Sequence, residues 1–594
     1  MFLSVFSGLS CFSQIITPDN KLRLIIRQEG QAEVTLPYSD IKSIELLTTN
    51  VSILSVKDKI VHISLSPLTV EWFILQKYDY QIVDKVAPKG IISAPDLNKA
   101  MDWDYYPTYT QYDSIMQSFK TLYPSLCRLD TIGTSINGKL ILALKISDNP
   151  AIDGDKPSVF YTSTMHGDET GGYILMLHLA DYLLKNYSLS DRVKNLIDNL
   201  EIWINPLANP DGTYNNGNVI NSPTRYNANG YDLNRNFPDP FTPNTVKQKE
   251  TLDMIKFLRK HKFVLSANFH SGSEVVNYPW DRWFSKFHAD DSWFNAISRS
   301  YADTAHVYAG PEYMNFLDNG VTRGADWYIV YGGRQDFETW ELHGREVTVE
   351  LDDQFITPAP QLPLLWQNNW HSLFGYLENA LYGIHGLVRD VNSHNPLSAE
   401  VFINGHDKDS SQVYSDTLSG NFVRFLSPGS WNLTFSAAGY RDTTINAIVY
   451  SDTLSGNFVR FLSPGSWILT FSATGYRDTT INATVFSGQK TDLIVDMSTI
   501  TSGIEPINSI AHLLIYPNPA TDFINIILPD KTVGRMNLRI INQAGKLVTD
   551  YNIEVVQGIP VIIDTKYLSA GTYTIVFTSS VTEASFHGRI VVIK

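Results

Sequence analysis

Cysteine is scarce in this sequence: Cys11 and Cys127 are its two examples in 594 residues. A fold held together by several disulfides is therefore excluded. Cys11 lies in the apolar stretch 1–14, which is typical of the later part of a secretory signal with a small-residue exit near Ser13. No Lys or Arg precedes these apolar residues, which a truncated or misassigned start would explain. The mature chain would then carry one thiol and no disulfide.

A cluster of basic side chains is also missing. The formal net charge is -15, from 46 Lys and Arg against 61 Asp and Glu. Nucleic-acid binding needs a concentrated basic surface that can meet phosphates, so nucleic acid is not expected as a partner. Beyond the first residues, no segment has the roughly 18 consecutive apolar residues that a transmembrane helix requires. The acidic charge balance favours a protein that is soluble or lies at a cell surface.

The length and the hydrophobic patterning predict several domains, about three to five at roughly 100–200 residues each. Residues 15–100 alternate strand-like runs ("LRLIIRQ", "VSILSV", "IVHISLS") with an amphipathic stretch near 38–47, and they end in a turn-rich linker. We expect a small α+β N-terminal domain here. In residues 101–383, helical patterns such as "YILMLHLADYLLKNY" alternate with apolar strands such as "SVFYTSTM". This alternation predicts an α/β domain with a parallel or mixed central sheet.

The remainder of the chain predicts β-sandwiches. Residues 384–500 alternate apolar and polar residues between Gly, Pro and Ser turns, and after a polar linker at 501–511 the same pattern returns in 512–594. Within the first of these regions, 414–449 recurs at 450–485 with three differences, namely Asn432/Ile468, Ala438/Thr474 and Ile448/Thr484. Solenoids normally need about three or more repeats with diverged caps, so we interpret this as a duplication of a few strands within one sandwich.

Polar side chains follow several of the predicted strands at the point where each strand ends. In "YTSTMHGDETGGY" (161–173), His166 and Glu169 follow a strand, and alone this pair could be an ordinary polar turn. However, His270 follows "KFVLSANF", Glu350 closes "REVTVE" and "NPLANPDG" follows "EIWI". Because open α/β sheets bind ligands at the carboxyl ends of their strands, we expect these groups to meet at one edge. Two His and one carboxylate are a typical ligand set of zinc hydrolases.

Six stretches resemble the zinc metallocarboxypeptidases, most closely the regulatory branch that carries a transthyretin-like β-sandwich after the catalytic domain. They are "HGDETGGY" (166–173), "NPDGT" (209–213), "TRYNANGYDLNRNFPD" (224–239), "HSGSEVVNYPWD" (270–281), "DWYIVYGGRQDF" (326–337) and "EVTVELDD" (346–353). Their order and spacing match throughout 105–383. The resemblance implies a catalytic domain at 101–383 and a transthyretin-like sandwich at 384–500.

The resemblance implies that His166, Glu169 and His270 bind one Zn²⁺, with Asp232 orienting His166. A zinc-ligating imidazole normally donates its other N–H to a carboxylate, which suits Asp232. Glu350 would be the general base that acts on a zinc-activated water. Glu346 lies four residues earlier on the same strand face and is the rival candidate.

For the substrate, the resemblance implies that Arg225 stabilises the oxyanion of the tetrahedral intermediate. Asn234 and Arg235 would clamp a free terminal carboxylate, and Tyr328 would close over it. This carboxylate clamp would make the protein an exopeptidase.

The resemblance also places Asp281 and Gln335 in the pocket for the terminal side chain. An aspartate there would favour a C-terminal Arg or Lys, because an unpaired pocket charge penalises an apolar guest. The alternative is that Asp281 caps a turn or pairs with Arg282. His178, in the middle of an apolar helical pattern, is expected to be packed or on the surface, and not a metal ligand.

The C-terminal residues 512–594, with "LLIYPNPATDF" and "LSAGTYTIVF", resemble the sorting domain of proteins exported by the type IX secretion system of Bacteroidetes. The resemblance implies recognition by that machinery and a secreted or cell-surface location; a plain adhesive sandwich is the alternative. Residues 15–100 would be either an inhibitory pro-segment or an accessory domain.

The whole chain is thus expected to be an exported zinc carboxypeptidase acting on the C-termini of peptides or proteins. Two alternatives remain, a zinc amidase or cell-wall peptidase on the same scaffold, and a non-catalytic surface binding protein. The intact carboxylate clamp argues against the first. The occupied ligand and base positions argue against the second.

Overall fold

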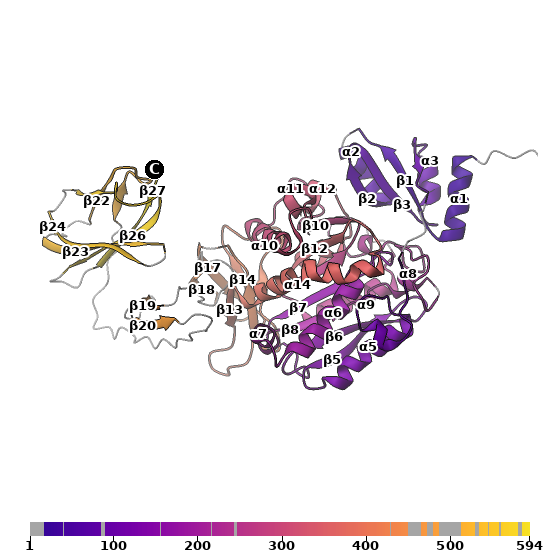
Figure 1. The fold of residues 1–594 in the computed structure, drawn as a ribbon, viewed down its shortest axis with the longest axis horizontal. Coiled ribbons are helices and arrows are strands. Elements are labelled where there is room, and N and C mark those ends of the chain that lie inside the picture. Colours follow the sequence, from indigo (N-terminus) through magenta and orange to yellow (C-terminus); the bar gives the residue numbers. More distant parts are fainter. Residues whose placement is uncertain are drawn as a thin grey trace, which may run out of the picture. The chain divides into compact units, whose positions relative to one another are not determined.

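The computed structural model describes residues 17–449, apart from 40, 85–89, 155, 216, 243–245 and 428, and then 465–471, 479–485, 513–528, 534–543, 546–556, 560–579 and 585–593. The chain divides into two compact units, Met1–Phe458 and Val459–Lys594. Figure 1 shows the elements of each unit. The expected signal at 1–14 and the linker at 501–511 lie outside the described residues. Within the described residues, no helix is long and apolar enough to cross a membrane.

The first unit begins with a small α+β domain whose antiparallel sheet has the strand order β2-β3-β1-β4. Helices α1, α2 and α3 accompany this sheet (Figure 1). The elements are α1 (Pro18–Glu29), β1 (Ala32–Pro37), α2 (Ile41–Asn50), β2 (Ser52–Lys57), β3 (Ile60–Leu65), α3 (Val70–Leu75) and β4 (Gln81–Ile82).

The strand expected for "LRLIIRQ" is wrong, because these residues belong to helix α1. Thr17 caps the helix by accepting the N–H of Asn20, and Pro18 occupies the first turn, where its missing N–H costs nothing. Gly30 ends the helix in the left-handed conformation, with φ of 78°. Leu22 and Ile26, four residues apart, are the buried positions. A short apolar run does not distinguish a strand from a buried helix, and the flanking caps decide it here.

The next domain is built on a mixed eight-stranded sheet, as the alternating pattern predicted. Its order is β11-β10-β12-β9-β7-β8-β6-β5. Neighbouring strands β12, β9, β7 and β8 run parallel, so their carboxyl ends lie at one edge. The strands are β5 (Cys127–Thr134), β6 (Leu140–Ile146), β7 (Ser158–Ser163), β8 (Glu201–Asn205), β9 (Leu265–His270), β10 (Ser273–Tyr278), β11 (Val321–Arg323) and β12 (Arg345–Asp352).

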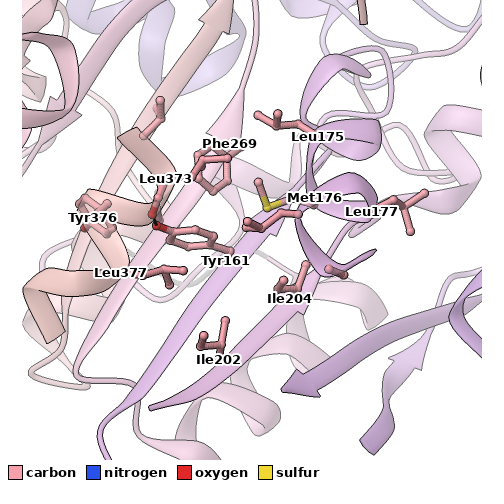
Figure 2. Close-up of a cluster of buried hydrophobic side chains, with 14 of the residues drawn as sticks. Tyr161, Leu175, Met176, Leu177, Ile202, Ile204, Phe269, Leu373, Tyr376 and Leu377 are labelled. Atoms are coloured by element: carbon pink, nitrogen blue, oxygen red, sulfur yellow. Dashed lines mark hydrogen bonds between the residues drawn. The ribbon is translucent and has the colours of Figure 1, made fainter. Parts of the chain in front are cut away.

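Helices pack on this sheet through two separate apolar clusters, one of which involves α5, α6, α7, α10 and α14, and the other α9 and α13. Figure 2 shows the first cluster, where Met176 and Leu373 meet Tyr161 and Phe269 of the strands. His178 is packed as predicted, stacking on Trp103 and Trp366. The helices are α4 (Leu97–Ala100), α5 (Tyr109–Leu122), α6 (Gly171–Asn186), α7 (Asp191–Asn199), α8 (Pro210–Tyr214), η1 (Leu233–Arg235), α9 (Lys249–His261), α10 (Asp291–Ala309), α11 (Phe316–Gly320), α12 (Gly324–Trp327), α13 (Arg334–Trp340), η2 (Ala359–Gln361), α14 (Leu362–Glu378) and η3 (Asn379–Leu381).

A β-sandwich follows, with one sheet of β13 and β16 and another in the order β15-β14-β17-β18. Its strands are β13 (Ile384–Leu387), β14 (Glu400–Ile403), β15 (Val413–Tyr414), β16 (Asn421–Arg424), β17 (Gly429–Ser436) and β18 (Thr443–Val449). The first repeat copy therefore supplies β16, β17 and β18 and the end of β15. In the second copy, β19 (Gly465–Phe471) and β20 (Thr479–Val485) form a two-stranded sheet of their own among the described residues.

The two copies keep the same pairing register. Trp431 faces Ala447 in β17 and β18, and Trp467 faces Ala483 in β19 and β20. The second hairpin therefore repeats the pairing register of the first, and the inclusion of both copies in one sandwich stays a prediction.

A largely buried group of charged side chains joins the sandwich to the α/β domain. We call it the interdomain charge cluster; its members are Asp290, Arg345, His406, Asp407 and Arg424. The guanidinium of Arg345 donates to Asp290 Oδ2 at 2.8 Å, and Arg424 donates to the same oxygen at 2.5 Å. His406 Nε2 lies 2.8 Å from Asp290 Oδ1. Arg424 also pairs with Asp407, a residue of the sandwich itself.

The second unit contains an all-β module, in agreement with the alternating pattern. Its two sheets have the orders β21-β22-β25 and β24-β23-β26-β27. Apolar residues from both sheets, including Ile524, Ile563, Leu538 and Ile575, form its core. The strands are β21 (Leu514–Tyr516), β22 (Phe523–Ile527), β23 (Gly534–Asn542), β24 (Leu547–Val555), β25 (Val561–Asp564), β26 (Gly571–Ser579) and β27 (Ser585–Val592).

Candidate active site

Three of the predicted site residues lie at the edge where the parallel strands end. His166 follows β7, His270 is the last residue of β9, and Glu350 pairs with His270 across the β9–β12 register. Glu169 lies one turn after His166. The sheet topology therefore brings together side chains that are up to 184 residues apart, counted from His166 to Glu350.

His166, Glu169 and His270 converge with their nitrogen and oxygen atoms close together. His166 Nδ1 lies 2.8 Å from Glu169 Oε1, and His270 Nδ1 lies 2.7 Å from Glu169 Oε2. The two Nδ1 atoms are 3.1 Å apart. All three side chains are buried, and they form one of the two groups in the described residues that could hold a metal ion.

The outer atoms of both histidines are oriented so that the inner nitrogens carry lone pairs. His166 Nε2 lies 3.0 Å from Asp232 Oδ1, an oxygen that accepts a hydrogen bond when ionised, so Nε2 can carry the ring proton and leave the lone pair on Nδ1. His270 Nε2 faces the side-chain Nδ2 of Asn268 at 2.7 Å, and Asn268 Oδ1 has no hydrogen-bond partner among the described residues. Turning that amide over would let Oδ1 accept the His270 Nε2–H. Two lone pairs and a carboxylate then face one point, which is a set of donors that fits Zn²⁺.

Arg225 and Asp232 form hydrogen bonds with members of this trio and with each other. Arg225 Nη1 donates to Glu169 Oε1 and Arg225 Nε to Asp232 Oδ2, both at 3.0 Å. Burial alone would raise the pKa of Asp232, but Arg225 and His166 beside it hold that pKa well below its usual value. Asp232 therefore stays ionised and keeps the His166 ring in one orientation.

Glu350 and its rival Glu346 have different surroundings. Glu350 lines the pocket of the histidines, and its Oε2 is buried without a hydrogen-bond partner in the part of the chain that the structure describes. Burial raises its pKa well above the ordinary value, with the nearby charge of Glu169 adding to this shift. Glu346 is fully buried instead, pairs with Arg334 at 2.7 Å and accepts from Ser266 at 2.8 Å. Of the two, Glu350 is therefore the one that faces the pocket.

The predicted carboxylate clamp lines the same pocket. Arg235 donates through Nη1 to the carbonyl of Asn234 at 3.0 Å, while its Nε and Nη2 are buried without partners among the described residues. Asn234 Oδ1 accepts the N–H of Arg334 at 3.0 Å, which fixes the side-chain amide. Tyr328 also lines the pocket. The two unused N–H groups of Arg235 match the two oxygens of a carboxylate.

Asp281 is buried at 4% exposure and does not pair with Arg282, which binds Asp239. Asn277 and Gln335 donate their amide N–H groups to Asp281 Oδ1 at 3.1 and 3.0 Å. Their own carbonyl oxygens are buried and have no partner in the described part of the chain. Burial raises the pKa of Asp281 to about 6. Gly324 leaves the room for this arrangement, because a Cβ there would come within 1.7 Å of Asp281 Oδ1.

Sequence reasoning missed Asn277 and the residues that the N-terminal domain places in the pocket. Asn277 lies four residues before Asp281, a spacing that could have indicated it. Ile53 and Leu54 line the pocket beside the histidines. Leu54 falls at a break in the β2–β3 register, between Ile53 and Ser55, and such bulges commonly redirect a side chain.

Hydrogen bonds hold the N-terminal domain in this position. Ser52 Oγ donates to Asp232 Oδ2 at 2.6 Å, and Tyr328 donates to the carbonyl of Ile53 at 3.5 Å. Close to Tyr328, the hydroxyl of Thr48 donates to the carbonyl of Ile329 at 2.5 Å. The N-terminal domain thus contacts both the reaction centre and the loop that carries Tyr328.

Two family models match this chain. The model described as zinc carboxypeptidase matches residues 112–372, and the model of the secretion system C-terminal sorting domain matches residues 514–592. Carboxypeptidase M of Mus musculus is 33% identical over 363 residues, covering 57% of this chain and 80% of that protein. The chain belongs to the zinc carboxypeptidase family. Within that family it is similar to the regulatory-type carboxypeptidases, and it carries a C-terminal sorting domain.

Two further relatives and one solved structure are also similar. The carboxypeptidase N catalytic chain of Homo sapiens is 32% identical over 383 residues, covering 56% of this chain and 81% of that protein. Carboxypeptidase D of Homo sapiens is 32% identical over 389 residues, covering 61% of this chain, and the chain spans 28% of that protein's length. The structure of carboxypeptidase A from Helicoverpa armigera has a TM-score of 0.46 at 17% identity, covering 59% of this chain and 97% of that chain.

Proposed function

We propose that this protein is a zinc carboxypeptidase that removes the C-terminal residue of peptides or proteins. One observation carries the proposal. A set of donors that fits Zn²⁺ and the unpartnered Nε and Nη2 atoms of Arg235 line one buried pocket of the described chain. A substrate that reaches both must present a free terminal carboxylate next to its last peptide bond.

The chain's own residues have distinct roles in this reaction. His166, Glu169 and His270 would hold one Zn²⁺, which supplies Lewis acidity to the scissile carbonyl and to water. Glu350 accepts a proton from the attacking water at Oε2 and delivers it to the amide nitrogen as the C–N bond breaks. Arg225 stabilises the negative charge that develops on the carbonyl oxygen. Asn234, Arg235 and Tyr328 bind the terminal carboxylate and so orient the last peptide bond.

We further propose a preference for C-terminal Arg or Lys. Asp281 supplies the counter-charge, and its Oδ1 is already fixed by the amides of Asn277 and Gln335. The two amide carbonyls have no hydrogen-bond partner among the described residues and remain available as acceptors. A cationic side chain would meet several acceptors here, whereas an apolar one would leave them unpaired in a buried pocket.

We propose that the N-terminal domain is an inhibitory pro-segment, the first of the two roles considered for residues 15–100. Leu54 and Ile53 occupy space beside the zinc ligands, and Ser52 donates a hydrogen bond to Oδ2 of Asp232. A substrate needs the same space, so hydrolysis requires the domain to move away. The sorting domain supports export by a secretion system, and we propose a cell-surface or released location.

The test uses the full chain and the variant Leu54→Glu, which would place a carboxylate among Glu169, Glu350 and Asp281 and so displace the domain. Leu75→Glu is the matched control, because Leu75 is 75% exposed on the same domain. All three proteins are given otherwise identical peptides ending in Arg, Lys, Phe or an amidated Arg, with and without a chelator. We expect Leu54→Glu to cleave the free acids, Arg and Lys best, and the unsubstituted chain and Leu75→Glu to be slow.

Each contrary result removes a different part of the proposal. Equal rates on amidated and free peptides would show that the clamp does not select a carboxylate. A preference for Phe would remove the role of Asp281. Equal rates for the unsubstituted chain and Leu54→Glu would remove the inhibitory role of the N-terminal domain. Activity that survives complete removal of the metal would contradict a zinc enzyme.

A further inference from the structure

Asn404 and Gly405 form the exposed tip of a short loop that follows strand β14 of the sandwich. At the base of this loop, the N–H groups of His406 and Asp407 donate to the carbonyl of Ile403 at 3.1 and 3.0 Å. Asp407 Oδ2 accepts the N–H of Ile403 at 2.8 Å, which closes the loop. Gly405 has a φ of 78°, a backbone conformation that glycine adopts without strain. An Asn–Gly pair is therefore held at the outer end of a closed loop.

The base of this loop belongs to the interdomain charge cluster. His406 Nε2 lies 2.8 Å from Asp290 Oδ1, and Asp407 pairs with Arg424. Asp290 and Arg424 are buried, so each depends on these contacts to balance its charge. The two residues that directly follow the Asn–Gly pair thus help to neutralise buried charge between the α/β domain and the sandwich. A change in the path of the main chain at 404–405 would act on both of them.

This Asn–Gly pair is less constrained than the others that the structure describes. The sequence contains five such pairs, which begin at Asn137, Asn216, Asn229, Asn319 and Asn404, and Asn216 lies outside the described residues. The N–H groups of Gly138 and Gly230 donate to backbone carbonyls at 3.1 and 2.9 Å, and Gly320 is buried. Neither the Gly405 N–H nor the Asn404 side chain has a hydrogen-bond partner among the described residues. A Cβ at Gly405 would meet no atom within 4 Å, so the space around this peptide group is open.

We propose that Asn404 is a site of spontaneous deamidation, and that the isoaspartate formed there weakens the interdomain charge cluster. Asparagine is a thermolabile residue, and a following glycine offers no side chain to hinder the reaction. The backbone nitrogen of Gly405 attacks Cγ of Asn404, a C–N bond forms, and the side-chain amide leaves as ammonia with the proton of the Gly405 N–H. Water then opens the resulting cyclic imide at one of its two carbonyl carbons and yields aspartate or isoaspartate. Water is the only co-reactant, and nothing is oxidised or reduced.

The isoaspartate product changes both the length of the main chain and the charge. The bond between Gly405 and Cγ is kept, so the main chain gains one carbon and about 1.5 Å of contour length. The former backbone carbonyl of Asn404 becomes a free carboxylate. Because the loop is closed at 403 and 407, the added length has to be absorbed between these positions. His406 and Asp407 then shift relative to their buried partners, which destabilises the junction between the peptidase and the sandwich.

The test incubates the full chain and the variant Asn404→Gln at neutral pH, below the temperature of unfolding. The longer Gln side chain has to close a larger ring, which forms more slowly, so this variant is the matched control. Isoaspartate is located by mass spectrometry of digests. We expect it at 404 in the unsubstituted chain before it is found at 137, 229 or 319, and not at 404 in the variant. The thermal midpoint of the aged unsubstituted chain should fall towards that of Arg424→Met, while aged Asn404→Gln keeps the midpoint of fresh protein.

Freshly prepared Asn404→Asp separates charge from main-chain length, because it adds a carboxylate without the extra carbon. Its midpoint should stay close to that of the unsubstituted chain. Isoaspartate at 137, 229 or 319 ahead of 404 would overturn the assignment of the site. Isoaspartate at 404 with an unchanged midpoint would overturn its link to the interdomain charge cluster. An equal fall of the midpoint in fresh Asn404→Asp would overturn the role of the longer main chain.

Discussion

Two clusters in the described part of this protein bring histidine and carboxylate atoms close enough to hold a metal ion, and they differ in what surrounds them. One is the trio of His166, Glu169 and His270, and the other contains Asp290, His406 and Asp407. In the trio, both histidines can direct a lone pair inward, His270 once the Asn268 amide is turned over. In the interdomain charge cluster, by contrast, Arg345 and Arg424 already donate to Asp290, and His406 lies within hydrogen-bond distance of its other oxygen.

The comparison shows that proximity of ligand types does not define a metal site. What matters is whether positive charge is already present. Asp290 and Asp407 receive arginine donors, so a cation would have to displace them at the cost of leaving buried guanidinium groups unpaired. In the trio, a single arginine, Arg225, is shared between Glu169 Oε1 and Asp232, whereas Asp290 alone receives two arginine donors. The first cluster is therefore arranged for binding a metal, and the second for stability.

The largest expected difference is in the effects of substituting Glu350 and Glu346, which lie on the same strand. Glu350→Gln removes the proton acceptor and should lower kcat by about 10³-fold or more, with zinc content unchanged. Glu346→Gln removes the partner of the buried Arg334, so it should instead cost about 3–5 kcal/mol of stability while the folded fraction keeps its kcat. Both are compared in the Leu54→Glu background by steady-state kinetics and thermal unfolding. The opposite assignment of the two effects would make Glu346 the base.

Metal content separates the two histidine clusters. We expect about one zinc per chain in the unsubstituted protein, almost none in His270→Ala, and about one in His406→Ala, because arginine donors already occupy the carboxylates of the second cluster. Elemental analysis after dialysis against a weak chelator measures this. Loss of zinc in His406→Ala with retention in His270→Ala would reverse our distinction between the clusters.

A substitution in the interdomain charge cluster should lower the stability of the protein and leave its catalytic rate unchanged. Arg424 is fully buried, and Arg424→Met leaves Asp290 and Asp407 without this partner, which should cost about 3–5 kcal/mol. Thermal unfolding then shifts to lower temperature, while kcat of the folded enzyme stays unchanged. Arg441→Met, at an exposed position of the same sandwich, is the matched control. An unchanged midpoint in Arg424→Met would show that the cluster contributes little.

The smallest effect is a pH dependence of substrate preference. Burial raises the pKa of Asp281 to about 6, so its negative charge is present above that pH and is lost below it. The kcat/KM ratio of Arg-ending to Leu-ending peptides should therefore be constant near pH 7–8 and fall by up to about tenfold per pH unit well below the pKa. Taking a ratio cancels the titration of Glu350, which both substrates share. A ratio that stays level down to pH 4 would remove Asp281 as the charged determinant.

Much of the site could be predicted from the sequence because its residues follow strands. His166, His270 and Glu350 each end or follow an apolar run, and parallel pairing of those strands brings the three together. The central sheet was predictable for the same reason, since alternating helices and strands leave few alternatives. Asp281 was located through the motif. The sequence did not show, however, that Arg282 would pair with Asp239, 43 positions earlier, and not with Asp281.

The contribution of the N-terminal domain could not be predicted in this way. The apolar run within the helix at Pro18–Glu29 is short enough to fit a strand equally well, and the caps that distinguish the two lie outside it. Leu54 enters the pocket at a bulge, and no periodic pattern marks a single extra residue in a strand. Gln31 is an isolated polar residue whose partners, Asp168 and Arg225, lie 137 and 194 residues later. Contacts between domains depend on how whole surfaces meet, which local patterning does not describe.

The interdomain charge cluster also bears on how such a chain can be inherited. The segment that matches the peptidase family ends at residue 372, yet the partners that complete Asp290 are His406 and Arg424 in the following sandwich. A recombination event that joined this peptidase to an unrelated neighbour near residue 383 would leave two buried charges, Asp290 and Arg345, to balance each other alone. We therefore expect the peptidase and its sandwich to be inherited as one unit that extends to about residue 449. Recombination can exchange the modules beyond that residue without breaking this cluster.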